Sequence, residues 1–120
     1  MAVNTASDLV DRYFTALTQK DWTTLRTTLR DDLSFRGPLA TLDKAEAYVQ
    51  GLQRIRERVT SMERRAIFAQ GDDVLQIYDV TLAESAVTVP VAEWIQVRDD
   101  QIVAVEMFLD ARPLAAPPAQ

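Results

Sequence analysis

The hydrophobic period of this chain changes once along its length, near Val59. Before that point apolar residues recur every three to four positions, which predicts one helix over roughly residues 5–19 and two more that begin at Asp21 and Asp43. After it the apolar residues alternate with polar ones, which predicts strands. These strands are expected near residues 59–70, 73–83, 86–98 and 101–110. Helices followed by an antiparallel meander predict an α+β domain.

The size and composition of the chain fit one globular domain. It has 120 residues, of which 48% are hydrophobic and 26% charged. The net charge of −5 argues against general nucleic-acid binding, which favours a basic surface. We expect no membrane partner and a cytoplasmic location, because the start of the chain lacks a signal-peptide pattern and no run approaches about 20 apolar residues. The domain is expected over residues 1–112, with a flexible Pro/Ala-rich tail at 113–120.

Two residue types are missing, and their absence restricts the kinds of catalytic and metal site that the chain could form. The chain has no cysteine and no histidine. A thiolate nucleophile, a Ser-His-Asp triad and an ordinary zinc site are therefore excluded. With only three glycines, a glycine-rich phosphate loop is excluded as well. Catalysis would have to rely on carboxylates, Tyr, Lys, Arg or Ser/Thr, and nothing in the sequence requires a metal or an organic cofactor.

Two acidic residues occupy predicted strands on what the alternation assigns to the apolar side. Asp79 alternates with Leu75 and Ile77, and Glu93 alternates with Val91 and Ile95 on the next strand. A carboxylate facing a core is costly unless it is paired, protonated or open to a pocket. We therefore expect Asp79 and Glu93 to share a pocket, with one pKa raised. Two alternatives stay open: an arginine neutralises either residue, or a shifted strand register turns both to solvent.

Five segments carry a resemblance to a known fold. They are residues 8–14, 21–22, 35–39, 91–99 and 102–110. Together with the order of elements, these segments resemble the nuclear-transport-factor-like (ketosteroid isomerase-like) superfamily, and in particular its SnoaL-like branch. The resemblance implies three helices packed in a curved, mainly antiparallel sheet that forms a cone with an internal pocket. The same fold hosts many chemistries and also plain binders, so it does not by itself specify a function.

The resemblance to ketosteroid isomerases implies roles for two residues of this chain, while the general base of those enzymes has no matching residue here. In those enzymes a tyrosine and a protonated carboxylic acid donate hydrogen bonds to the developing oxyanion, an arrangement that is itself a known example of a carboxyl kept neutral by an apolar site. Tyr13 falls on the tyrosine position, and Glu93 falls on or beside the acid position. The general-base position falls on Gly37 or its neighbour Arg36, so that route to steroid isomerisation is not expected. As an alternative, Tyr13 is simply a core residue.

The other relatives fit to different degrees. Limonene epoxide hydrolases use an Arg and two Asp; Asp79 lies at one of those positions, but the others fall on Met107 and Ile77. Scytalone dehydratases rely on His, which this chain lacks. The mechanism of the SnoaL-type polyketide cyclases needs the fewest matching residues, because one strand carboxylate serves as acid/base. Either Asp79 or Glu93 could take that role in this chain.

Further residues are expected to line the pocket or to form an interface. The expected pocket walls are Trp22, Phe35, Arg36, Tyr48, Ile77, Ile95 and Met107. Three large aromatics are assigned to the opposite face of the sheet, where they favour a homodimer interface. These aromatics are Tyr78, Trp94 and Phe108.

The sequence thus favours a small-molecule pocket protein. The leading hypothesis is a cofactor-free acid/base enzyme of the isomerase, cyclase or dehydratase type that acts on a small apolar carbonyl compound. In it Asp79 is the base, while Glu93 and Tyr13 stabilise an enolate-like oxygen. The alternative is a non-catalytic ligand-binding or dimeric assembly module, and a weaker option is a protein–protein adaptor.

Overall fold

Helices come first and strands follow, as the change of period predicts. The computed structural model describes the backbone of residues 5–115 and the side chains of residues 5–114. Its elements are α1 (Ala6–Gln19), α2 (Trp22–Thr27), β1 (Leu29–Arg36), β2 (Thr41–Leu42), α3 (Ala45–Arg56), β3 (Val59–Gln70), β4 (Asp73–Leu82), β5 (Thr88–Arg98), β6 (Gln101–Leu109) and α4 (Arg112–Ala115). The α+β class and the four long strands are confirmed, whereas β2 and α4 were not anticipated.

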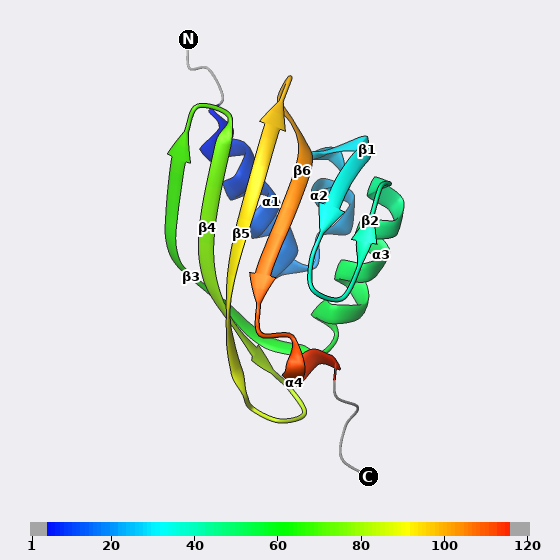
Figure 1. Cartoon of the computed structure of the whole chain (residues 1–120), viewed down its shortest axis with the longest axis vertical. Coiled ribbons are helices and arrows are strands. Elements are labelled where there is room, and N and C mark those ends of the chain that lie inside the picture. Colours follow the sequence, from blue (N-terminus) through cyan, green and yellow to red (C-terminus); the bar gives the residue numbers. More distant parts are fainter. Residues whose placement is uncertain (1–4, 116–120) are drawn as a thin grey trace.

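The six strands form one curved, mixed sheet. Their order is β2-β1-β6-β5-β4-β3, and every neighbouring pair is antiparallel except β1 and β6, which run parallel. Figure 1 shows α1 and α2 behind the sheet and α3 beside its β1–β2 edge. The edge strands β2 and β3 do not pair with each other, so the sheet curves around the helices without closing.

The alternation of buried residues along β4 and β5 defines an inner face of the sheet. On β4 this face carries Val74, Gln76, Tyr78, Val80 and Leu82, and on β5 it carries Val89, Val91, Glu93, Ile95 and Val97. The two sets lie side by side, because Gln76 is the register partner of Glu93. Asp79 therefore lies on the outer face, and the prediction that it shares a side with Glu93 is wrong.

The start of α1 has a local side-chain cap, while the start of α3 has none. Thr5 and Asp8 form a reciprocal capping box at α1. The predicted cap at Asp43 is wrong: the N-cap of α3 is Lys44, whose side chain makes no capping hydrogen bond. The first turn of α3 is instead tied to the rest of the fold through Glu46, which accepts a 2.7 Å hydrogen bond from Arg26 Nε.

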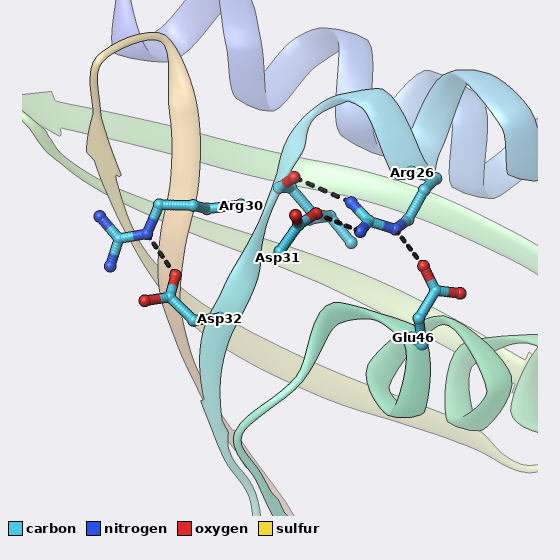
Figure 2. A network of polar contacts seen from close by, with 6 residues as sticks. Arg26, Arg30, Asp31, Asp32 and Glu46 are labelled. Carbon is cyan, nitrogen blue, oxygen red and sulfur yellow. Dashed lines mark hydrogen bonds and ion pairs between the residues drawn. The ribbon is translucent and has the colours of Figure 1, made fainter.

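Arg26 joins three elements at this corner. Besides Glu46 on α3, its guanidinium contacts Asp31 on β1 at 2.5 Å and the carbonyl of Leu29 at 3.0 Å. Figure 2 shows these contacts beside a second ion pair, between Arg30 and Asp32. The guanidinium of Arg26 is thus committed to groups at this corner, and it does not neutralise Glu93.

Buried apolar residues form two groups between the helices and the inner face. The larger one includes Leu9, Val10, Tyr13, Leu17, Leu25, Leu29, Leu33, Tyr48, Val74, Ile95, Ile102 and Val105. The smaller one consists of Phe14, Val59, Tyr78, Val80, Leu82 and Val91. Burial of each large side chain contributes about 1.5–3 kcal/mol, so these two groups stabilise the position of α1 and α3 against the sheet.

The chain continues past β6 into the short helix α4, which is tied to Arg58, the residue before β3. Arg58 donates a 2.9 Å hydrogen bond from Nη1 to the carbonyl oxygen of Leu114, and it also pairs with Glu84 at 2.7 Å. The segment 113–120, expected as a tail, therefore begins inside α4. Its last part, residues 116–120, lies outside the described residues.

Candidate functional site

Glu93 is the centre of a polar cluster buried inside the domain. Its side chain is fully buried, and its two carboxylate oxygens have different partners. Oε1 accepts a 2.8 Å hydrogen bond from Gln76 Nε2. Oε2 faces the hydroxyls of Tyr13 at 3.3 Å and Tyr48 at 3.5 Å. The two hydroxyls also hydrogen-bond to each other, so three oxygens meet in one small space.

Four elements bring these side chains together. Tyr13 lies on the buried stripe of α1 and Tyr48 on that of α3, while Gln76 and Glu93 are neighbours on β4 and β5. A helix presents residues of one stripe to the sheet, and a strand presents every second residue to the helices. The cluster therefore forms where one tyrosine from each helix meets β4 and β5 at the inner face.

Burial dominates the electrostatics of the cluster. Loss of solvent raises the pKa of Glu93 to about 7, although the hydrogen bonds from Gln76, Tyr13 and Tyr48 act to lower it. Burial, followed by the proximity of Glu93, also raises the pKa of the Tyr13 and Tyr48 hydroxyls well above their ordinary range. At neutral pH the tyrosines stay protonated, and Glu93 is the group that changes charge.

An apolar cavity of about 400 Å³ lies beside this cluster. Apolar side chains and glycine make up most of its wall, and Tyr48 and Tyr78 are the two tyrosines that contribute to it. The wall includes Leu17, Phe35, Leu42, Leu52, Ile55, Val59, Met62, Val80, Leu82, Val91, Met107, Leu109 and Leu114. Its size and lining are those of a small-molecule site.

The charged residues of the cavity wall are arginines. Within the part of the chain that the structure describes, Arg54 and Arg56 line the cavity and no Asp or Glu does. Arg56 donates hydrogen bonds to the carbonyl oxygens of Leu17, Thr18 and Val59, which occupies its guanidinium. Glu93 and Tyr13 are absent from the wall, so Tyr48 is the member of the Glu93 cluster that reaches the cavity.

Of the three predicted catalytic residues, Asp79, Glu93 and Tyr13, only two lie together. Tyr13 and Glu93 come together, as described above. Asp79 lies on the outer face, where its carboxylate is 3.4 Å from Arg65 Nη1. The error arises because both sides of β4 carry apolar residues: Leu75 and Ile77 accompany Asp79 outside, so alternation alone does not identify the inner side.

The predicted pocket residues divide into two groups. Phe35, Tyr48 and Met107 line the cavity. The other four lie elsewhere: Ile77 is on the outer face, Ile95 is fully buried in the core, Trp22 packs against that core, and Arg36 lies 3.8 Å from Glu106 in an exposed ion pair.

The outer face of the sheet carries exposed aromatic residues, as expected. Trp94 and Phe108 are 42% and 49% exposed, and Phe68 and Leu75 are exposed beside them. Tyr78 was assigned to this face as an interface residue, and that assignment is wrong. It is buried on the inner face because it follows the same alternation as Gln76.

Sequence reasoning missed two residues of the site, Gln76 and Tyr78. The signal was the alternation Val74, Gln76, Tyr78, Val80, Leu82, which reads as an inner face with a polar residue in its middle. The Oε1 atom of Gln76 is buried without a hydrogen-bond partner among the described residues. Tyr78 contributes its ring to the cavity wall and packs against Phe14, with ring centroids 5.1 Å apart.

Two further observations concern metal ions and membranes. No three His, Cys, Asp or Glu side chains among residues 5–114 gather in a way that would bind a metal ion. None of the described helices has the length and apolar character needed to cross a membrane.

Three solved structures share this fold. An NTF2-like protein of unknown function from Cytophaga hutchinsonii is 21% identical, with a TM-score of 0.80 over 95% of this chain and 98% of that chain. A protein from Sinorhizobium meliloti that is provisionally named a polyketide cyclase is 20% identical, with a TM-score of 0.77 over 84% and 94%. An LEH-like epoxide hydrolase from M. tuberculosis is 23% identical, with a TM-score of 0.75 over 88% and 83%.

These identities establish a common fold and leave the reaction open. The M. tuberculosis hydrolase and the S. meliloti protein carry different functional names on the same architecture. A comparison with curated protein sequences finds no match. Residues 10–105, however, match the SnoaL-like domain family, and this match includes every residue of the Glu93 cluster. The chain therefore belongs to the SnoaL-like domain family.

Proposed function

We propose that the cavity binds a small, largely apolar molecule with a carbonyl oxygen, and that the Glu93 cluster assists an isomerase- or cyclase-type reaction of that molecule. The observation that carries the proposal is that Tyr48 belongs to both features. It lines the apolar cavity and contacts Tyr13 and Glu93 behind it. An apolar wall favours the body of the ligand, while a hydroxyl fixes the position of its oxygen.

The chemistry that this arrangement supports is stabilisation of an enol-like oxygen. A hydrogen bond from Tyr48 to the carbonyl oxygen becomes stronger as negative charge develops there, which assists loss of a proton from the adjacent carbon. Tyr13 and Glu93 assist by supplying the Tyr48 hydroxyl with a buried hydrogen-bond partner. The proton from carbon passes to a solvent molecule or to a basic group of the substrate.

A second function is favoured by one specific observation, the absence of a carboxylate from the described cavity wall. An enzyme that abstracts a proton from carbon uses a base within reach of that carbon. With Asp79 outside, the wall offers tyrosine hydroxyls and arginines. The alternative is therefore a protein that binds the same class of ligand without transforming it.

One experiment with a defined probe tests binding and chemistry together. The probe is 2-tetralone, an apolar bicyclic ketone whose hydrogens next to the carbonyl exchange through the enol. Binding is measured by protein NMR shifts, and exchange of these hydrogens in D₂O is followed by NMR of the ketone. Faster exchange that is lost in Tyr48→Phe supports the enzyme. Binding without faster exchange supports the binder, and no binding of ketones of this size contradicts both.

We also propose that two copies of the chain associate through the outer face of the sheet. Cross-strand register places Phe68, Leu75 and Trp94 in one row across β3, β4 and β5, with Phe108 nearby on β6. An exposed row of this kind is typical of an interface. A second copy of the same face is the partner that would cover it symmetrically.

A further inference from the structure

The two oxygens of Glu93 are not equivalent. Gln76 donates from Nε2 to Oε1, and that hydrogen bond fixes Oε1 as an acceptor. When Glu93 takes up a proton, the proton therefore goes to Oε2, the oxygen that faces Tyr13 and Tyr48. Gln76 thus directs the acidic proton toward the tyrosine that lines the cavity, and it acts as a positioning residue.

In the ionised state, the carboxylate holds the tyrosine protons inward. Oε2 can then only accept hydrogen bonds, and its neighbours are the Tyr13 and Tyr48 hydroxyls. Hydrogen bonds to a charged oxygen are roughly twice as strong as those between neutral groups. Whether Tyr48 donates directly to Oε2 or to the Tyr13 oxygen, its proton points into the cluster. Tyr48 lines the cavity, and in this state its hydroxyl has no proton to offer a ligand bound there and can only accept a hydrogen bond from it.

In the neutral state, this hold is released. Oε2–H now donates to the Tyr13 oxygen, Tyr13 donates to the Tyr48 oxygen, and the Tyr48 proton is no longer bound by a negative charge. Each of the three oxygens lies within hydrogen-bond reach of the other two, so this reversal needs only rotation of the hydroxyls. Tyr48 can now donate its proton to an acceptor in the cavity.

We propose that the protonation state of Glu93 sets whether Tyr48 donates or accepts a hydrogen bond at the cavity, and so selects the class of ligand. Neutral Glu93 favours a carbonyl compound, which can only accept. Ionised Glu93 favours an apolar phenol or alcohol, which can donate. The inference rests on the proposed function, because it needs a ligand that contacts Tyr48 in the cavity.

Among the titratable groups of this cluster, Glu93 is the one whose protonation state changes. Tyr13 faces it from α1, Tyr48 from α3, and Tyr78 lies near it on β4. Its register partner on β6 is the uncharged Met107. All three tyrosine hydroxyls have a raised pKa and stay protonated, whereas burial raises the pKa of Glu93 to about 7, so the exchange of ligand class falls near neutral pH.

The test compares two probes of one size and opposite hydrogen-bonding character. They are 2-tetralone, which accepts, and 5,6,7,8-tetrahydro-2-naphthol, which donates. The dissociation constants of both are measured at pH 5.5 and pH 8.5. Because one hydrogen bond is gained or lost, we expect the ratio of the two constants to change about tenfold in favour of the phenol at the higher pH.

Two variants separate the switch from other pH effects. In Glu93→Gln, the amide carbonyl can accept from Gln76 while its NH₂ faces the tyrosines, which imitates the neutral acid at every pH. Its ratio should stay at the value of the wild type at pH 5.5. The matched control is Asp79→Asn, an outer-face carboxylate, which should keep the full change with pH. Tyr48→Phe should abolish the change even if the glutamine variant does not fold.

Each outcome has a distinct meaning. A ratio that changes in the wild type and stays constant in Tyr48→Phe supports the switch. Two probes that bind with a constant ratio overturn the switch and leave the proposed function standing. If neither probe binds at either pH, the proposed function for this ligand class fails and the switch fails with it.

Discussion

Replacing Glu93 with glutamine should stabilise the fold at neutral and alkaline pH and remove a pH dependence from its stability. The carboxylate is fully buried, and its side-chain hydrogen bonds come from one amide and two hydroxyls. At high pH the wild type must therefore keep a negative charge in an apolar interior, where none of the described residues pairs with it as a cation. Glutamine keeps the shape and the hydrogen-bonding capacity and carries no charge.

The magnitude follows from the two pKa values. Glu93 titrates near 4.5 in the unfolded chain and at about 7 in the folded one. Between these values the folded state binds one proton more than the unfolded state, so the free energy of unfolding falls by about 1.4 kcal/mol per pH unit. Below pH 4.5 the contribution is fully present, and above pH 7 it is lost. The whole change is about 3 kcal/mol, a large part of the stability of a small domain.

Urea denaturation at half-unit steps from pH 4 to pH 8.5 measures this quantity. The free energy of unfolding of the wild type minus that of Glu93→Gln should decrease by about 3 kcal/mol across the range, with the steepest part between pH 4.5 and 7. Asp79→Asn serves as the control, because Asp79 lies on the outer face beside Arg65. A difference that stays flat with pH would refute the claim that Glu93 is desolvated.

Three more changes test other parts of the structure. Gln76→Leu removes a hydrogen bond that lowers the pKa of Glu93, so that pKa should rise above its wild-type value. Carboxyl-carbon NMR measures the pKa, and an unchanged or lower value would contradict the contact. Trp94→Lys should weaken self-association at least tenfold by analytical ultracentrifugation; an unaltered dimer would place the interface elsewhere. Gly71→Ala should lower the free energy of unfolding, measured by denaturation, by about 1 kcal/mol because Gly71 has φ +59°. Gly51→Ala should be neutral or stabilising, because Gly51 lies in α3 and nothing lies within 4 Å of the added Cβ.

The fold could be predicted because its signals are long and mutually consistent. Each of the four C-terminal strands spans nine or more residues, and a turn sequence such as Gly71-Asp72 separates them. Along β4 and β5 buried and more exposed residues also alternate regularly. The helix predicted over roughly residues 5–19 from its apolar spacing likewise corresponds to α1 (Ala6–Gln19). What was missed is short or tertiary in origin: the two-residue β2 pairs with β1, and the start of α3 is held by the distant Arg26.

The site was harder to predict, because its decisive facts are not local. Along β4 both faces contain apolar residues, so alternation could not tell whether Gln76 or Asp79 points inward. The side is decided by where α1 and α3 pack. Glu93 was found because its own strand alternates cleanly between buried and exposed residues. The contact of Tyr48 with Tyr13 joins residues 35 positions apart, and an apolar stripe on each helix does not predict that the two hydroxyls meet.

Phe35 limits which side chains position 37, in the wall of the cavity, can accept. The resemblance to ketosteroid isomerases puts their general base at Gly37 or its neighbour Arg36, and a Cβ atom placed on Gly37 would lie 2.8 Å from the tip of the Phe35 ring. That ring in turn packs on Tyr48, with centroids 4.9 Å apart. A carboxylate at position 37 therefore becomes sterically accessible only after the ring has moved or been made smaller. A smaller side chain at position 35 should therefore lessen the cost of introducing that base, so the two substitutions together should be less harmful than the substitution at position 37 alone.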